Sequence, residues 1–169
     1  MNELTLNTAF KINAYDVYDR IKPSAIFDEF QNVASLHADK LGVGFDDLIR
    51  KNAVWMLIRC RYDVISYPAF EQPLNITTYP FKPKGIEFDR EYEITDKSGN
   101  KLIKGTSMWC ICNYETRKLL FGNEVKYSDE DYSDMYDRVA KRTHRYYVLE
   151  FLYSSLLVVT PPFVSLEPF

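Results

Sequence analysis

One long amphipathic segment, residues 25–41, most constrains how this chain can fold. At about 100° per residue, its apolar side chains fall on one side of a helix and its polar side chains gather on the other. Gly42 follows at once and is a typical residue at the end of a helix. Pro23 and Ser24 both suit its beginning, as a first-turn residue and as an N-cap. The pattern predicts a helix over Ala25–Leu41, buried along the side formed by Ile26, Phe30, Val33, Ala34, His37 and Leu41.

Strand patterns surround this helix. The aromatic content of 15%, with only six glycines, favours broad, half-buried sheet surface. Residues 96–100 have the composition of a hairpin turn. Because one helix follows the first strand and antiparallel strands follow the helix, we expect an α+β protein. The predicted strands are Phe10–Val17, Ala53–Val64, Leu74–Phe81, Ile86–Thr95 and Lys101–Tyr114, and a shorter helix is predicted over Gly44–Lys51.

Composition excludes several classes of protein. The 169 residues suffice for one domain, and a net charge of −3 provides no basic field for nucleic acid or an anionic membrane. The apolar residues 151–169 are too short and too interrupted by Pro161 and Pro162 to span a membrane. Three cysteines and two histidines without metal-site spacing predict reduced thiols and no zinc site. Residues 1–16 are polar and lack the apolar core of a secretion signal, so we expect a cytoplasmic protein.

Four stretches resemble the first half of the acyl-ACP thioesterases: Gln31–Leu48, Val54–Pro68, Thr77–Leu102 and Ser107–Leu120. The resemblance runs from about residue 10 to residue 120, and its marks are Gln31, Ala34 and His37 before Leu41-Gly42, then Trp55, Arg90 and Trp109. It implies a hotdog fold, in which an antiparallel sheet wraps around a long central helix. It also implies hydrolysis of medium or long fatty acyl thioesters in fatty acid biosynthesis, with no metal and no cofactor.

The resemblance further implies two hotdog repeats, with the catalytic carboxylate, Asn and His in a D-x-D-x-N-x-H-V-N-N motif of the second. Here residues 145–150 resemble the approach to that motif, but Phe151–Ser155 stands in its place. In the first repeat, Arg20 and Lys22 replace the Asn and His. We therefore expect a hotdog domain over residues 1–127, a charged connector and the start of a second repeat over 128–150, and an atypical apolar tail over 151–169. Because this catalytic motif is absent, we expect the chain to hydrolyse thioesters poorly.

Three side chains of the long helix are candidate catalytic groups. Thioester hydrolysis needs a general base and donors for the developing oxyanion, and the start of a helix supplies backbone donors. Asp28 is a base if a partner subunit desolvates it, or else an exposed acid that stabilises the helix dipole. Gln31 lies beside it. His37 is either a base or a core residue with one hydrogen bond.

Four large apolar residues are candidates for binding the acyl chain: Trp55, Met56, Met108 and Trp109. By pattern alone they are core residues, and the resemblance makes them walls of an acyl tunnel. Four bases are candidates for contacting an acidic carrier protein or a phosphopantetheine phosphate, or are scattered surface charges: Arg59, Arg61, Lys82 and Lys84.

Two other functions remain open. The first is a non-catalytic acyl-binding or dimerisation domain. The second is a single-hotdog acyl-CoA thioesterase that acts as a homodimer, for which Asp28 is the test. The expected partners are acyl carrier protein or acyl-CoA and a fatty acyl chain. A homodimer is expected in each case, because one hotdog leaves a sheet edge to cover.

Overall fold

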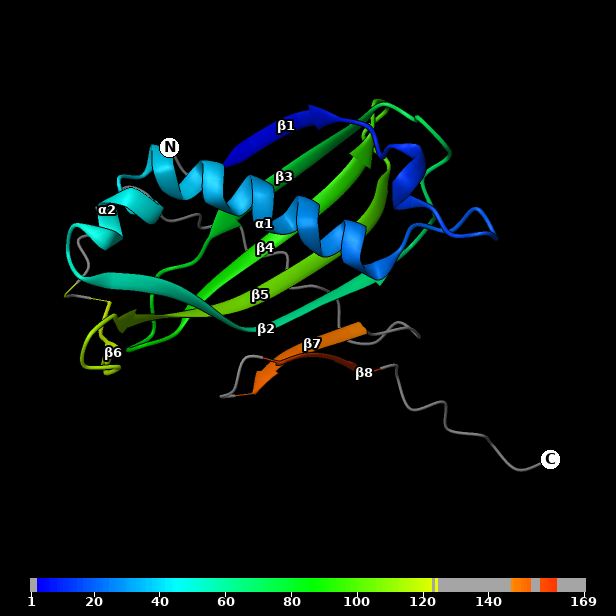
Figure 1. Ribbon diagram of the computed structural model, residues 1–169. Coiled ribbons are helices and arrows are strands. Elements are labelled where there is room, and N and C mark those ends of the chain that lie inside the picture. The colour runs from blue at the N-terminus through cyan, green and yellow to red at the C-terminus, as the bar shows by residue number, and fades with distance from the viewer. Residues whose placement is uncertain (1–2, 123, 125–146, 153–155, 161–169) are drawn as a thin grey trace.

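A computed structural model describes residues 3–122, 124, 147–152 and 156–160. An antiparallel sheet in the order β1-β3-β4-β5-β2-β7-β8, with β6 paired to β5, curves around the long helix α1 (Figure 1). The helices are η1 (Ile12–Ala14), α1 (Pro23–Lys40) and α2 (Phe45–Ile49). The strands are β1 (Leu4–Thr8), β2 (Ala53–Val64), β3 (Leu74–Pro80), β4 (Phe88–Asp96), β5 (Lys101–Asn113), β6 (Leu119–Leu120), β7 (Tyr147–Leu152) and β8 (Leu156–Thr160). The predicted α+β hotdog fold is confirmed.

The long helix begins and ends close to the predicted residues. Lys22 is its N-cap and Pro23 its first residue, where a missing N–H costs nothing. Ser24 is therefore inside the helix and not its N-cap, and the alternative prediction, Pro23 as a first-turn residue, is confirmed. At the other end, Gly42 adopts a φ of +70°, a left-handed conformation that favours glycine, and its N–H donates to Asp39 O at 3.1 Å.

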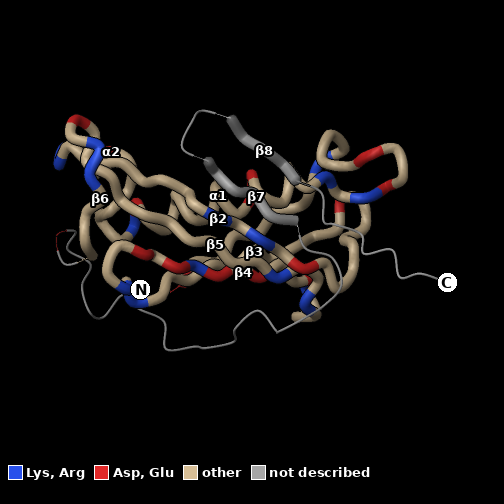
Figure 2. The backbone as a smooth tube through the Cα atoms, turned by 90° about the horizontal axis from the view of Figure 1, so that it is seen from below, with Lys and Arg blue, Asp and Glu red and all other residues tan. Residues whose placement is uncertain are grey.

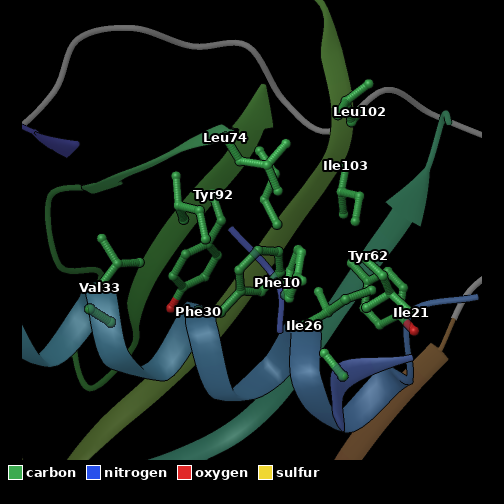
Figure 3. Close-up of a cluster of buried hydrophobic side chains, with 14 of the residues drawn as sticks. Phe10, Ile21, Ile26, Phe30, Val33, Tyr62, Leu74, Tyr92, Leu102 and Ile103 are labelled. Atoms are coloured by element: carbon green, nitrogen blue, oxygen red, sulfur yellow. The ribbon is translucent and has the colours of Figure 1, made fainter. Parts of the chain in front are cut away.

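The apolar side of α1 packs on the sheet. Ile26, Phe30 and Val33 are almost completely buried, and Figure 3 shows them facing side chains of the strands. The Phe30 ring stacks on Tyr92 of β4 with 4.3 Å between ring centroids. Gly105 of β5 makes room for this ring, because a Cβ there would lie 2.1 Å from Phe30 Cε2. The first half of α1 therefore builds a close-packed core.

The first predicted strand is wrong. Residues 10–17 contain the short helix η1, and the strand lies earlier, at β1, paired with β3. A compact turn explains the difference: Asp16 Oδ1 accepts hydrogen bonds from the backbone N–H of Tyr18 at 2.8 Å and of Arg20 at 3.0 Å. Hydrogen bonds of this kind let an Asp side chain replace strand pairing by a local turn.

The other strands and the short helix follow the predictions within a few residues. The predicted turn at 96–100 is also present, with Asp96 N–H donating to Asn100 O at 3.0 Å. Acidic and basic residues both occur along the strands of the sheet (Figure 2). Within the described residues, no helix combines the length and apolar character needed to cross a membrane.

The C-terminal part of the chain is described only as two strands. β7 pairs with β2 between Arg59 and Tyr62, and β8 pairs with β7. Both strands fall in or beside the segment predicted to be an apolar tail. Of the connector and second-repeat start predicted over 128–150, residues 128–146 lie outside the described residues, so the boundaries at 127 and 150 stay predictions.

Candidate functional site

A cavity of about 250 Å³ lies between the second half of α1 and the sheet. Small side chains of α1, Ala34 and Ala38, face it where the first half of the helix carries Phe30. Phe45 of α2 lines it as well, so the cavity occupies the end of α1 that leads into α2 (Figure 1). The space exists because alanines do not reach the sheet as larger residues do.

Aromatic side chains form the opposite wall. Trp55 of β2 meets Phe88 of β4 edge-on, with ring centroids 5.0 Å apart, and meets Trp109 of β5 at 6.4 Å. Trp55 Nε1 donates to Val43 O at 2.8 Å, and Trp109 Nε1 donates to Ser107 Oγ at 2.7 Å. Because each indole N–H is bonded to protein, both indole rings present apolar surface to the cavity.

A buried arginine interrupts this apolar wall. Arg90 of β4 lines the cavity and is only 6% exposed. Its Nη1 donates to His37 Nδ1 at 3.0 Å and to Thr78 Oγ1 at 3.2 Å. The Thr78 hydroxyl in turn donates to Glu91 O at 2.9 Å. Within the described part of the chain, no carboxylate forms an ion pair with Arg90.

The contact with Arg90 determines the protonation of His37. A guanidinium only donates hydrogen bonds, so His37 Nδ1 must accept. His37 is completely buried. It is therefore a neutral imidazole with its proton on Nε2, and protonation of Nδ1 would break the bond to Arg90. His37 positions the arginine, and whether it also acts as a base stays a prediction.

Polar side chains form the rim of the cavity. Gln31, Ser35 and Asp39 lie along one side of α1, and all three are exposed. Asp89 of β4 is half-buried, and removal from water raises the pKa of its carboxyl, although Lys84 and Arg59 act in the opposite direction. The site thus joins an apolar interior to a rim that keeps contact with solvent.

The structure separates the four residues predicted to bind the acyl chain. Trp55 and Trp109 line the cavity. Met56 is 47% exposed and alternates with Trp55, so it lies on the other side of β2. Met108 alternates with Trp109 in the same way on β5 and accepts a contact from Arg59 Nη2 at 3.9 Å. Neither methionine lines the cavity, and the binding roles of all four stay predictions.

The candidate catalytic residues are also separated. Gln31 lines the cavity rim, His37 lies beneath it, and Asp28 is exposed on α1 away from the cavity lining. Asp16, four residues before Arg20, is used by its own turn, where the backbone N–H groups of Arg20 and Tyr18 lower the pKa of its carboxyl. Lys22 Nζ donates to Asn13 O at 3.0 Å. The catalytic roles of Asp28, Gln31 and His37 stay predictions.

Sequence reasoning overlooked Arg90 as part of a site. The signal was present, because Arg90 occupies the phase of the strand that otherwise carries Phe88, Tyr92 and Ile94. A charged residue on the buried side of a strand is uncommon and points to a special role. Within the described residues, no three His, Cys, Asp or Glu side chains gather as a metal site would require.

Comparison with known proteins places this architecture in a family. The profile of the acyl-ACP thioesterase N-terminal domain matches residues 3–124. Among curated relatives, an acyl-[acyl-carrier-protein] hydrolase of Cuphea viscosissima and a palmitoyl-acyl carrier protein thioesterase of Arabidopsis thaliana are each 26% identical over 125 residues. In both cases the match covers 69% of this chain and 30% of the relative, so the chain spans about a third of the relatives' length.

Solved structures share the fold at low identity. An acyl-ACP thioesterase from Bacteroides thetaiotaomicron superposes with a TM-score of 0.74 at 23% identity, covering 85% of this chain and 58% of the other. A 12:0-ACP thioesterase from Umbellularia californica gives 0.69 at 18% identity, covering 85% and 60%. A DHNA-CoA thioesterase from Staphylococcus aureus gives 0.66 at 14%, covering 74% and 84%. Taken with the profile match, these results show that the chain belongs to the acyl-ACP thioesterase family, with residues 3–124 as its N-terminal hotdog domain.

Proposed function

We propose that this chain binds the acyl group of fatty acyl-ACP, as the acyl-binding hotdog unit of a thioesterase. In the reaction, water adds to the thioester carbonyl and the C–S bond breaks, which releases a free fatty acid and the thiol of the carrier. The observation that carries the proposal is the cavity between the alanines of α1 and the aromatic wall of the sheet. An alkyl chain placed there is removed from water, which favours binding by about 25 cal/mol per Å² of apolar surface.

The same geometry supports weak hydrolysis by these residues alone. Asp28 is exposed and outside the cavity lining, and the Nδ1 atom of His37 already accepts a hydrogen bond from Arg90. Neither group is placed to activate a water molecule at a carbonyl inside the cavity. Because a positioned general base contributes about 10²- to 10⁴-fold to rate, turnover should fall by a factor of that order.

Self-association fits this proposal. β5 pairs with one side of β2, and on the other side the described pairing with β7 covers only Arg59 to Tyr62. An exposed strand edge is a template for pairing with another chain. We therefore expect a homodimer through β2. Sedimentation at tens of micromolar, roughly the concentration at which a weak dimer forms, measures the oligomeric state. A stable monomer would contradict the expectation.

The proposal is tested with a panel of acyl-ACP and acyl-CoA thioesters of increasing chain length. Both tryptophans of the chain line the cavity, so intrinsic fluorescence reports occupancy directly. Saturable binding that strengthens with chain length, together with slow release of fatty acid, is the expected result. Absence of binding would overturn the acyl-binding role. Fast turnover would place a working base in the chain, and Asp28→Asn and His37→Ala would then locate it.

A further inference from the structure

The hydrogen bonds of Arg90 leave one edge of its guanidinium open. Both bonds, to His37 and Thr78, come from Nη1, the nitrogen cis to Cδ. The Nε and Nη2 atoms lie together on the opposite edge, and their N–H groups point in parallel. This pair forms the fork that binds a carboxylate in a bidentate manner.

The open edge belongs to the cavity. Arg90 is only 6% exposed, and it forms part of the cavity wall. In the described part of the chain, Asp63 Oδ1 is the buried side-chain polar atom without a hydrogen-bond partner. Arg90 makes both of its hydrogen bonds through Nη1, and neither Nε nor Nη2 is a fully buried atom without a partner. These two nitrogens are therefore accessible from the cavity.

A buried charge without a counter-charge is costly. Within the described residues no carboxylate pairs with Arg90, and its two partners on Nη1 are an imidazole and a hydroxyl. Buried charges in proteins are normally paired or satisfied by a ligand. Arg90 therefore provides the cation of an ion pair, and an anionic group on a bound ligand would provide the counter-charge.

The surroundings of Arg90 define which anion fits. The walls are the apolar faces of Trp55, Trp109 and Phe88, which suit an aliphatic body. Asp39 and Asp89 also line the cavity, and their negative charges disfavour a dianionic phosphate more than a singly charged group. A volume of about 250 Å³ suits a short or medium chain, since it lies just under the roughly 300–1,000 Å³ of pockets for drug-sized ligands.

We propose that the cavity binds a free fatty acid, with its carboxylate held by the Nε–Nη2 edge of Arg90 and its chain against the tryptophans. This inference rests on the proposed function, because a free fatty acid is the product of thioester hydrolysis. It goes further in one respect. The site retains the product through a charge that the thioester substrate lacks, so product competes with the acyl group for the cavity.

The experiment compares two ligands that differ only in the head group. The protein is titrated with decanoate below its critical micelle concentration and with 1-decanol below its solubility limit, and tryptophan fluorescence is followed. Hydrogen bonds to a charged group predict that decanoate binds about 10- to 100-fold more tightly than the alcohol. Arg90→Met should abolish this preference while keeping the affinity for decanol, and Arg90→Lys should reduce it because the fork is lost.

The matched control is Arg117→Met, which removes an exposed arginine between β5 and β6 and should leave the preference unchanged. Melting temperatures and circular dichroism establish that each variant is folded. If Arg90→Met does not fold, the ratio measured on the unsubstituted protein and on Arg90→Lys decides. Equal binding of acid and alcohol to the unsubstituted protein would overturn the inference but leave the acyl-binding role standing. Binding of neither ligand would overturn both.

Discussion

The two halves of α1 meet the same sheet with opposite results. In the first half, Phe30 stacks on Tyr92 with ring planes 8° apart and occupies the space that Gly105 leaves open. In the second half, Ala34 and Ala38 leave a cavity of about 250 Å³ in front of an aromatic wall. One helix and one sheet therefore provide both a core and a site. The size of the helix side chain decides which of the two forms.

Polar groups follow the same division. In the first half, Tyr92 is buried and its hydroxyl pairs with Ser107 Oγ at 2.8 Å. In the second half, Arg90 keeps donors that face the cavity. Ser107 lies between the two, because it also accepts the indole N–H of Trp109. Satisfied polar groups stabilise a core, and polar groups with spare donors are available to a ligand.

The largest effect is expected at the close-packed half. Phe30→Ala removes a completely buried ring and leaves a void that the sheet cannot fill. We expect a loss of about 3–5 kcal/mol in the free energy of unfolding. Denaturant unfolding measures it, with Leu36→Ala as the control on the same helix, since Leu36 is 41% exposed. Similar losses for the two variants would mean that the first half of α1 is not a core.

A smaller loss should follow from crowding the same contact. Gly105→Ala places a Cβ 2.1 Å from Phe30 Cε2, so the ring must move. Overpacking of this kind costs about 1–3 kcal/mol. If the clash is the cause, Phe30→Leu should relieve it, and the double variant should be more stable than the sum of the single losses predicts. Additive losses would show that Gly105 serves another purpose.

The division of α1 into a core half and a cavity half could be predicted from the sequence only in part. Periodicity identified α1 and its buried side, because a helix of eighteen residues leaves little freedom in where its apolar side chains point. The strand predicted at residues 10–17 failed because Asp16 forms its own turn. Local hydrogen bonds of this kind outweigh strand propensity and do not show in an apolar pattern.

The site was harder to predict than the fold. Trp55 and Trp109 were identified as a possible tunnel wall, yet Met56 and Met108 were grouped with them although each alternates to the other side of its strand. The cavity depends on the small size of Ala34 and Ala38. In the sequence, these two alanines contribute only to the apolar side of the helix, and their size gives no sign of a cavity. A void results from packing between distant segments, so no single segment of sequence contains it.

The cavity half can be tested by filling it. Ala38→Leu adds a branched side chain where the first half of α1 carries large residues. We expect an affinity loss for decanoate of about tenfold or more, equal to about 1.4 kcal/mol, with little change in stability because free space receives the added atoms. Asn32→Leu, on the exposed side of α1, is the control. A stability loss as large as that of Gly105→Ala would mean that the second half is as tightly packed as the first.

The smallest effect concerns how the two halves respond to pH. In the core half, burial raises the pKa of Tyr92 to about 12, so this hydroxyl stays protonated throughout the acid range. At the cavity, burial raises the pKa of Asp89, with Lys84 and Arg59 opposing the shift and Glu87 adding to it.

The folded protein therefore binds the Asp89 proton more readily than the unfolded chain does. Its contribution to stability is fully present below the unfolded pKa and is lost as pH rises through the folded pKa. Asp89→Asn removes this loss, so the variant should gain stability relative to the unsubstituted protein as pH rises from about 4, near the unfolded pKa of an aspartate, towards neutrality. Because Asp89 is half-buried and screened by solvent, the gain should be below about 1 kcal/mol. Melting temperatures across this range measure it, with Glu115→Gln as the exposed control. Parallel curves for Asp89→Asn and the unsubstituted protein would show that Asp89 does not make the stability of the cavity half depend on pH.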